Sequence, residues 1–169
     1  MSKSASPLLP SGEGGGRKGV RKGALPSRRA IGPPDEGAAL AELFAGAKAA
    51  QANAYAPYSR FRVGAALRTT SGTVFSGCNV ENAAYPQGSC AEAGAIAAMA
   101  AAGERRIAEI LVIGDGEALC TPCGGCRQRI REFADASTPV HVAGPEGVRR
   151  TFTLGELLPE SFGPEHLGA

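Results

Sequence analysis

Apolar residues recur at helical spacing in some segments and in short continuous runs in others, which predicts helices interleaved with strands. Residues 38–54 place Leu40, Leu43, Phe44 and Ala47 on one face of a helix. Strands are expected at 61–67, 73–78, 109–114, 139–143 and 148–153, and further helices at 91–102, 124–133 and 154–158. This order is typical of a layered α/β domain with a mixed sheet.

Two of these segments are nearly free of polar residues. The run Glu109–Gly114 reads EILVIG, as expected of a central strand that is covered on both faces. The helix at 91–102 is almost entirely alanine, so burial is expected on most of its sides. Residues 79–88, between a strand and a helix, form a polar loop of the kind that commonly carries binding residues.

Residues 1–37 show no apolar period and are rich in Gly, Pro, Ser and basic residues, which predicts a disordered tail. They hold seven of the eighteen Lys and Arg residues but three of the sixteen Asp and Glu residues. The single domain expected at 38–169 is therefore mildly acidic, which argues against a nucleic-acid partner. The tail is interpreted as a solvated extension or the product of a wrongly assigned start codon; weak contact with nucleic acid or an anionic surface is the alternative.

The chain contains no run of 18 or more apolar residues, so no membrane span is expected. The tail lacks the apolar core of a signal peptide, and a cytoplasmic location is predicted. Three of the five cysteines fall in residues 120–126, a spacing that favours metal or redox chemistry over a disulfide framework. Because the chain has only two histidines, His141 and His166, a transition-metal site must rely on sulfur.

The stretch from Ser89 to Gln128 contains the residues best suited to such a site. Cys90 is expected at the start of one helix, and Cys123 and Cys126 at the start of the next. A helix N-terminus lowers the pKa of a thiol and so favours the thiolate that binds zinc. Both helix starts can meet at one edge of the sheet, so the three cysteines are predicted to hold a catalytic Zn²⁺ with one open position.

Glu92 follows Cys90 by two residues, close enough to act beside the metal without binding it. Zinc draws the pKa of a bound water toward neutrality, and Glu92 is predicted to take that proton and return it to the substrate and its leaving group. A CxxC pair alone also fits structural zinc or redox chemistry. Cys120 is a possible alternative ligand, but it precedes Pro122 in a segment expected to be exposed and is interpreted as a spare thiol. Cys78 is interpreted as a small buried hydrophobe.

The segments Cys90-Ala91-Glu92 and Pro122-Cys123-Gly124-Gly125-Cys126 form the Cys version of the zinc deaminase signature. From about residue 40 to 167 the chain resembles the small cytidine deaminases, with further collinear matches at Tyr55–Phe61, Gly77–Ala83 and Glu156–Pro159. The resemblance implies a three-layer α-β-α sandwich around a five-stranded mixed sheet. It also implies that Cys90, Cys123 and Cys126 hold zinc and that Glu92 shuttles protons. The expected reaction is hydrolytic deamination of cytidine and 2′-deoxycytidine in pyrimidine salvage.

The same resemblance implies how substrate is bound. Asn79 and Glu81 are expected to hydrogen-bond the ribose, a task that amide and carboxylate groups suit independently, and Phe61 is expected to pack against the base. The family forms homotetramers with shared active sites. The remaining expected substrate contacts are Ala91, Tyr85 and Phe162, the last two at positions that reach the site of a neighbouring subunit.

One position departs from the family's usual pattern. Many members have Arg directly after the catalytic Glu, where it bonds the zinc thiolates, whereas this chain has Ala93. The two helix N-termini must then offset the negative charge, with or without another basic group. We expect the zinc-bound water to be less acidic as a result.

Three other functions compete with nucleoside deamination. A related deaminase acting on a nucleoside antibiotic or modified base is disfavoured by the loop Asn79–Ala83, which matches the nucleoside enzymes. A polynucleotide deaminase is disfavoured by the acidic domain. A non-catalytic zinc module with an RNA-binding tail is disfavoured because Glu92 and the ribose loop are both retained.

Overall fold

The computed structural model of the chain describes residues 36–168. The predicted tail therefore lies outside the described residues, except for its last two positions, which belong to the first helix. The elements in chain order are α1 Glu36–Ala52, β1 Val63–Thr69, β2 Val74–Cys78, η1 Tyr85–Gln87, α2 Ala91–Ala101, β3 Ile107–Gly114, α3 Gly124–Phe133, β4 Pro139–Gly144, β5 Gly147–Thr153, α4 Leu154–Leu157 and η2 Pro164–Leu167. Every predicted helix and strand is present, with ends that shift by at most two residues.

The five strands form one mixed sheet in the order β2-β1-β3-β4-β5. The pair β3–β4 is parallel, and the other three pairs are antiparallel. A parallel pair needs a crossover connection, and α3 supplies it. The prediction of a five-stranded mixed sheet is confirmed.

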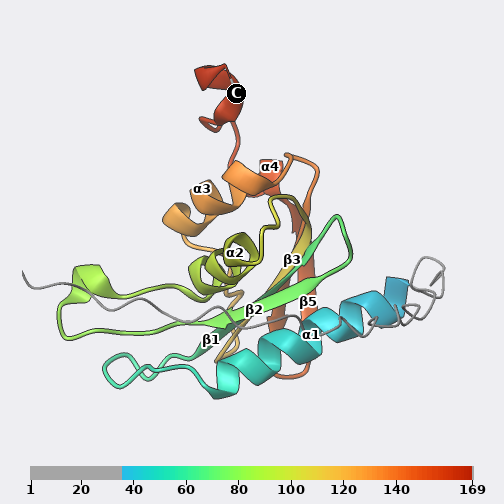
Figure 1. Cartoon of the computed structure of the whole chain (residues 1–169). Helices are drawn as coiled ribbons and strands as arrows, with labels where there is room; N and C mark the ends of the chain where they lie inside the picture. The colour runs from blue at the N-terminus through green and yellow to red at the C-terminus, as the bar shows by residue number, and fades with distance from the viewer. Residues whose placement is uncertain (1–35, 169) are drawn as a thin grey trace, which may run out of the picture. The chain divides into compact units, whose positions relative to one another are not determined.

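Two cores lie on opposite faces of the sheet, and β3 contributes to both. Ile110 and Val112 pack with residues of α2 and α3, whereas Leu111 and Ile113 pack with residues of α1. Successive residues of a strand point to opposite faces, so β3 is buried on both sides, as its sequence predicts. Helix α1 covers one face while α2 and α3 cover the other, which gives the predicted three layers (Figure 1).

A glycine in β2 lets α2 lie directly against the sheet. A Cβ atom at Gly77 would lie 2.4 Å from the backbone nitrogen of Ala95 and 2.6 Å from the carbonyl oxygen of Ala91. Only a residue without a side chain allows this approach. The contact sets how closely the N-terminus of α2, where Cys90 lies, approaches β2. It thereby also positions Cys90 relative to the polar loop that follows β2.

Burial of α2 is less complete than its sequence predicts. Ala95, Ile96 and Met99 face the core, but Ala97 and Ala98 are exposed. Alanine is apolar yet small, so an alanine-rich pattern does not reveal which side of a helix packs within its own chain. Among residues 36–168, none of the helices is both long and apolar enough to cross a membrane.

The C-terminal segment that ends in η2 extends away from the layered body (Figure 1). Two side chains of α3 hold it there. Gln128 Nε2 donates to the Phe162 carbonyl oxygen at 2.9 Å, and Arg131 Nε donates to Ser161 Oγ at 3.0 Å. Arg131 also pairs with Glu165. Helix α3 is therefore the support of this segment.

Candidate metal centre and adjoining cavity

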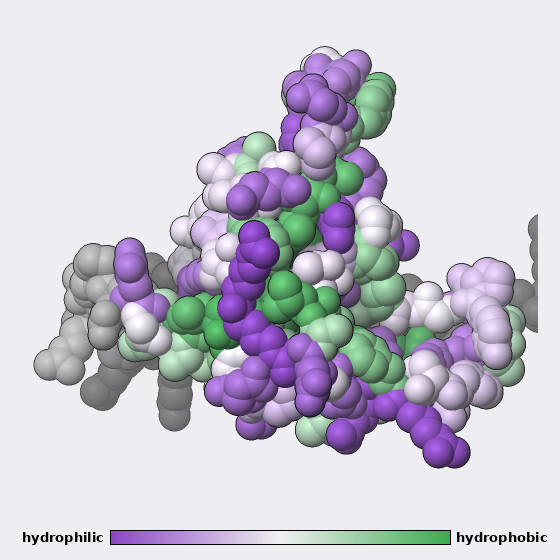
Figure 2. All heavy atoms as spheres, turned by 180° about the vertical axis from the view of Figure 1, so that it is seen from behind, coloured by the Kyte–Doolittle hydropathy of each residue, from purple (hydrophilic) through white to green (hydrophobic). Residues whose placement is uncertain are grey.

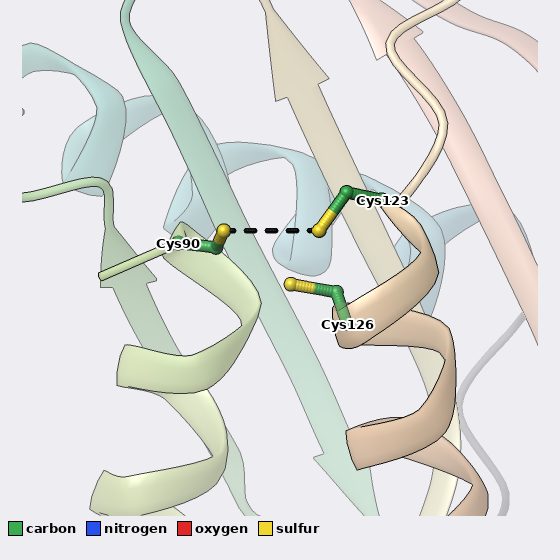
Figure 3. Close-up of side chains that lie close together, drawn as sticks. All are labelled: Cys90, Cys123 and Cys126. Atoms are coloured by element: carbon green, nitrogen blue, oxygen red, sulfur yellow. Dashed lines mark hydrogen bonds between the residues drawn. The ribbon is translucent and has the colours of Figure 1, made fainter. Parts of the chain in front are cut away.

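The three predicted ligands converge at the N-termini of two helices. Cys90 is the N-cap residue of α2, Cys123 is the N-cap residue of α3, and Cys126 lies in the first turn of α3. Their sulfur atoms point toward one another and lie within 4.8 Å of each other (Figure 3). The Cys90 and Cys123 sulfurs are 3.9 Å apart.

This spacing fits a tetrahedral zinc ion. With Zn–S bonds of about 2.3 Å, two sulfurs on a tetrahedron are separated by about 3.8 Å. The set offers three soft ligands and leaves a fourth position open, which is the arrangement of a catalytic rather than a structural site. No other cluster of three such ligand groups is found within residues 36–168.

Burial and neighbouring groups shift the pKa values of the three thiols in different directions. Burial raises the pKa of Cys126 and of Cys90, and the Glu92 carboxylate adds to both shifts. Burial also opposes ionisation of Cys123, but hydrogen bonds from the backbone and side chain of Cys126 and from Cys90 place its pKa below the ordinary value. A divalent cation among the sulfurs supplies the charge that stabilises all three as thiolates.

Glu92 lies in the first turn of α2, and its side chain is buried. Together with Cys90 and Cys123 it lines a cavity of about 370 Å³, a volume within the range of small-molecule sites. The other lining residues are Val63, Asn79, Val80, Glu81, Tyr85, Gly88, Ser89, Cys120 and Thr121. The predicted acid, two predicted ligands and both predicted ribose contacts therefore share one cavity.

Asn79 is held by two backbone hydrogen bonds to β1 and the residues before it. Its Oδ1 atom accepts from the Val63 N–H, and its Nδ2 atom donates to the Phe61 carbonyl oxygen, both at 2.9 Å. These partners fix the orientation of the amide and leave one N–H and one lone pair for a ligand. The predicted ribose contact thus also has a structural task that its sequence position does not reveal.

One of the two carboxylate oxygens of Glu81 is hydrogen-bonded to the protein backbone. Its Oε2 atom accepts from the Tyr58 N–H at 2.9 Å and the Ser59 N–H at 3.2 Å. The pKa of Glu81 is lowered, first by the neighbouring Ser59 side chain and also by these two backbone groups, while burial acts in the opposite direction. Within the described residues no hydrogen bond reaches Oε1, so this atom is available to a ligand.

The remaining predicted contacts differ in their relation to the cavity. The Phe61 ring lies beside Gly114, as does the side chain of Cys120, a cavity residue. The side chain of Ala91 is buried, so only its backbone N–H at the helix start is suited to a ligand. Tyr85 lines the cavity but is 78% exposed, and Phe162, on the C-terminal segment, is not among the lining residues.

Comparison with known proteins places this arrangement in a family. The family described as the cytidine and deoxycytidylate deaminase zinc-binding region matches residues 39–142, which include all three cysteines and Glu92. The chain is 42% identical over 126 residues to a cytidine deaminase of Sporosarcina psychrophila, covering 75% of this chain and 93% of that protein. It belongs to the cytidine deaminase family.

Solved structures of cytidine deaminases agree with this assignment. The crystal structure of the Burkholderia pseudomallei protein is 45% identical in sequence, with a TM-score of 0.68, and covers 72% of this chain and 98% of that one. The Mycobacterium tuberculosis protein is 37% identical, with a TM-score of 0.63, over 73% of this chain and 96% of that one. The expected fold is thereby confirmed; the roles of the individual substrate contacts stay predictions.

The structure corrects the prediction that Cys120 lies in an exposed segment. The thiol is not exposed: it is half-buried, packs against the core and lines the cavity. Gly114 explains the burial, because a Cβ atom there would lie 2.6 Å from the Cys120 Cβ atom. The missing side chain on β3 makes room for the loop, a relation that sequence spacing does not show. Cys78 is also only half-buried, and its thiol donates to the Asn53 carbonyl oxygen.

Although the chain has Ala93 in place of the usual arginine, another basic residue lies close in sequence to the metal ligands. Arg127 follows Cys126, but its guanidinium donates to the carbonyl oxygens of Pro122 and Leu157 and to the Thr121 hydroxyl. All of these acceptors are neutral, so Arg127 holds the CxxC segment without pairing with a carboxylate. Its charge adds to the positive ends of the two helix dipoles near the sulfurs.

Proposed function

We propose that this chain is a zinc-dependent hydrolase that converts cytidine and 2′-deoxycytidine to uridine and 2′-deoxyuridine in pyrimidine salvage. Water enters at C4 of the base and ammonia leaves. The observation that carries the proposal is that two of three convergent thiols, a buried carboxylate and a carboxylate with one available oxygen share a single cavity.

Cys90, Cys123 and Cys126 would hold the zinc ion, which when bound supplies a nucleophile at neutral pH by making water more acidic. Glu92 would accept one proton from water and deliver it to N3 of the base, and would then carry the second proton of the added water to the departing amino nitrogen. The side chain of Glu92 is buried, so its proton is shielded from exchange with bulk water during these steps.

Recognition of the nucleoside would come from Asn79 and Glu81 in the cavity and from Phe61 beside it. Oε1 of Glu81 and the remaining N–H and lone pair of Asn79 suit the sugar hydroxyls, and the Phe61 ring suits the base. A sugar without those hydroxyls would leave polar groups unpaired, which penalises its binding.

Loss of cytidine absorbance in the presence of purified protein tests this function directly. Turnover is expected with zinc, and none is expected after chelation. Glu92→Gln should lower kcat by about 10²–10⁴-fold because it removes the proton carrier. The variant should still bind zinc, since the three thiols remain. Absence of turnover on both cytidine and 2′-deoxycytidine would overturn the proposal.

We also propose a homotetramer in which Tyr85 and Phe162 contribute to neighbouring sites. Both rings are more than half exposed in the single chain, as are Tyr55 and Leu167. Hydrophobic surface lies open between hydrophilic side chains on the rear face (Figure 2). Exposed apolar surface of this kind often marks a contact between proteins.

The mass of the protein in solution tests the assembly. A mass near four chains is expected, and Phe162→Ala should reduce kcat/KM without changing the zinc content. A monomeric mass with full activity would contradict the assembly proposal. The cytoplasmic location and the separate nature of residues 1–37 stay predictions.

A further inference from the structure

The peptide group that joins Phe61 to Arg62 is held by two side chains from distant parts of the chain. Its carbonyl oxygen accepts a hydrogen bond from Asn79 Nδ2 at 2.9 Å, and its N–H donates to Asp115 Oδ2 at 3.2 Å. Asn79 directly follows β2, and Asp115 directly follows β3. The residue expected to pack against the base, Phe61, is therefore fixed on its C-terminal side by an amide and a carboxylate.

Gln51, in the last turn of α1, links Asp115 to the next carbonyl group of the same segment. Its Nε2 atom donates to Asp115 Oδ1 at 3.2 Å and to the Arg62 carbonyl oxygen at 3.1 Å. The Asp115 N–H donates to the same carbonyl oxygen at 3.3 Å. Gln51 is buried, which strengthens its bonds because water does not compete for them. Both carboxylate oxygens of Asp115 thus accept from groups of the protein.

The ion pair between Asp115 and the Arg62 guanidinium adds little to this arrangement. The paired atoms are 3.4 Å apart and the Arg62 side chain is 54% exposed, so solvent screens their attraction. The restraint on this segment comes instead from the bonds to the backbone and to buried Gln51. Asp115 therefore holds the backbone beside Phe61 rather than the Arg62 side chain.

The residue before Asp115 also lies against the Phe61 ring. A Cβ atom at Gly114 would lie 3.2 Å from Phe61 Cζ and 2.7 Å from the Cys120 sulfur. The ring and this cavity-lining thiol thus both border the space that Gly114 leaves open. The end of β3 meets Phe61 twice, at its ring through Gly114 and at its backbone through Asp115.

We propose that Asp115 is a positioning residue for binding of the base: together with Gln51 it fixes the backbone of Phe61, so that the ring is in place before the substrate binds. This inference rests on the proposed function, because it needs a pyrimidine nucleoside in the cavity. Asp115 is not among the cavity-lining residues and acts through Phe61. A ring that is already ordered avoids the entropy cost of ordering it on binding, which improves affinity rather than the chemical step.

Steady-state kinetics of Asp115→Asn with cytidine measures this effect. The substitution keeps the size of the side chain but turns one acceptor into a donor, so either the Arg62 N–H or Gln51 Nε2 loses its partner. KM should rise about five- to tenfold because Phe61 must then be ordered on binding, while kcat should change by less than about twofold. The zinc content should equal that of wild type, since the three thiols are unchanged.

A double variant tests whether the effect passes through Phe61. Phe61→Ala should raise KM by itself, because the ring that packs on the base is lost. In this background Asp115→Asn should raise KM further by less than about twofold, because no ring remains to be positioned. A merely structural role of Asp115 would raise KM by the same factor in both backgrounds.

Two matched variants separate the role of Asp115 from ion pairing in general. Arg62→Met removes the exposed ion pair and keeps the backbone bonds, so KM should change by less than about twofold. Asp135→Asn disrupts the bonds to Arg106, an exposed Asp–Arg pair at the opposite end of β3, and it should leave KM unchanged. A rise in KM in Arg62→Met as large as in Asp115→Asn would show that the ion pair is responsible and would overturn the proposal.

The outcomes distinguish this inference from the proposed function. Wild-type protein that turns over neither cytidine nor 2′-deoxycytidine would overturn both. With active wild-type protein, an unchanged KM in Asp115→Asn, a loss of zinc, or an equal effect in the Phe61→Ala background would overturn the role of Asp115 alone. If Asp115→Asn does not fold, Gln51→Met replaces it: it removes the donor to Asp115 and should raise KM about threefold, and an unchanged KM there would also overturn the role.

Discussion

At the scale of single residues, four thiols lie near the metal centre and position decides which of them bind. Cys120 lines the same cavity as Cys90 and Cys123, but it is not part of the cluster in which three sulfurs lie within 4.8 Å. Burial, with a smaller effect from Glu92, raises the pKa of Cys120 to about 11. Away from the cation, Cys120 therefore stays a neutral thiol at pH 7 and contributes packing alone.

Matched alanine substitutions test this distinction. Cys123→Ala should leave far less than one zinc per chain after dialysis, because two thiols bind zinc much more weakly than three. Cys120→Ala should retain about one zinc per chain. Metal analysis by mass spectrometry checks both variants. The reverse result would show that Cys120 is a ligand.

Site residues that are close together in the sequence were predictable, whereas contacts between distant residues were not. Cys90, Glu92 and the CxxC pair were predictable because helix N-termini and short spacings define their chemistry. The hydrogen bond from the Ser59 N–H to Glu81 was not predictable, because Glu81 lies 22 residues away and meets Ser59 only once the loop folds back. The second task of Asn79, which holds the Phe61–Val63 backbone, was hidden for the same reason.

At the scale of elements, the site depends on how closely α2 approaches β2. Gly77 on the strand and Gly94 on the helix face each other, but they tolerate a side chain very differently. A Cβ atom at Gly77 would lie 2.4 Å from backbone, whereas one at Gly94 would have its nearest contact at 3.5 Å, an ordinary van der Waals distance. The strand glycine, not the helix glycine, sets the approach.

This difference predicts opposite effects of two similar substitutions. Gly77→Ala must push α2 away and should destabilise the protein by about 1–3 kcal/mol, with loss of zinc affinity. Gly94→Ala adds a methyl group where there is room and should stabilise the helix by up to about 1 kcal/mol. Urea unfolding of the zinc-loaded proteins measures both. Equal destabilisation would contradict the account of the close approach.

Element types and ends were predictable to within two residues because hydrophobic period and Gly, Pro and Asn positions define them. Which face of α2 is covered was not predictable. An alanine-rich helix has little contrast between its sides, so only the positions of β1 and β2 reveal that Ala95 and Met99 are buried while Ala97 and Ala98 are not.

At the scale of the whole molecule, a polar network crosses the α1 face of the sheet from helix to edge strand. Arg68 on β1 bonds Glu42 of α1 at 2.8 Å and Glu109 of β3 at 2.9 Å. Glu109 also meets His141 Nε2 of β4 at 3.2 Å, and His141 Nδ1 contacts the Thr151 hydroxyl of β5 at 2.9 Å. The network links α1 to four strands.

The network predicts acid-sensitive stability. Hydrogen bonding to His141 and to Arg68 lowers the pKa of Glu109 despite its burial. A lowered folded-state pKa gives stability that is complete above the unfolded value of about 4.3 and is lost as pH falls through the folded value. Glu109→Gln should therefore cost about 1–2 kcal/mol at pH 7 and show a shallower loss below about pH 4.3.

Urea midpoints at several pH values between 7 and 3 check this expectation. Glu132→Gln is the control, because Glu132 is exposed on α3 and has no ion pair within the described part of the chain. It should follow the wild-type pH dependence. An acid limb of wild-type slope in Glu109→Gln would show that other carboxylates are responsible. The sequence did not suggest this network, since its members are scattered over more than a hundred residues.

The support of the C-terminal segment by α3 has a consequence for how the assembly responds to metal. One helix begins with two of the three thiols and, one and two turns later, holds the segment that carries Phe162 through Gln128 and Arg131. A bound metal ion would restrict the motion of the first turn of α3, and thereby of the helix that holds the C-terminal segment. In the proposed homotetramer, loss of metal from one subunit would therefore make its C-terminal segment, which would reach a neighbouring subunit, less ordered.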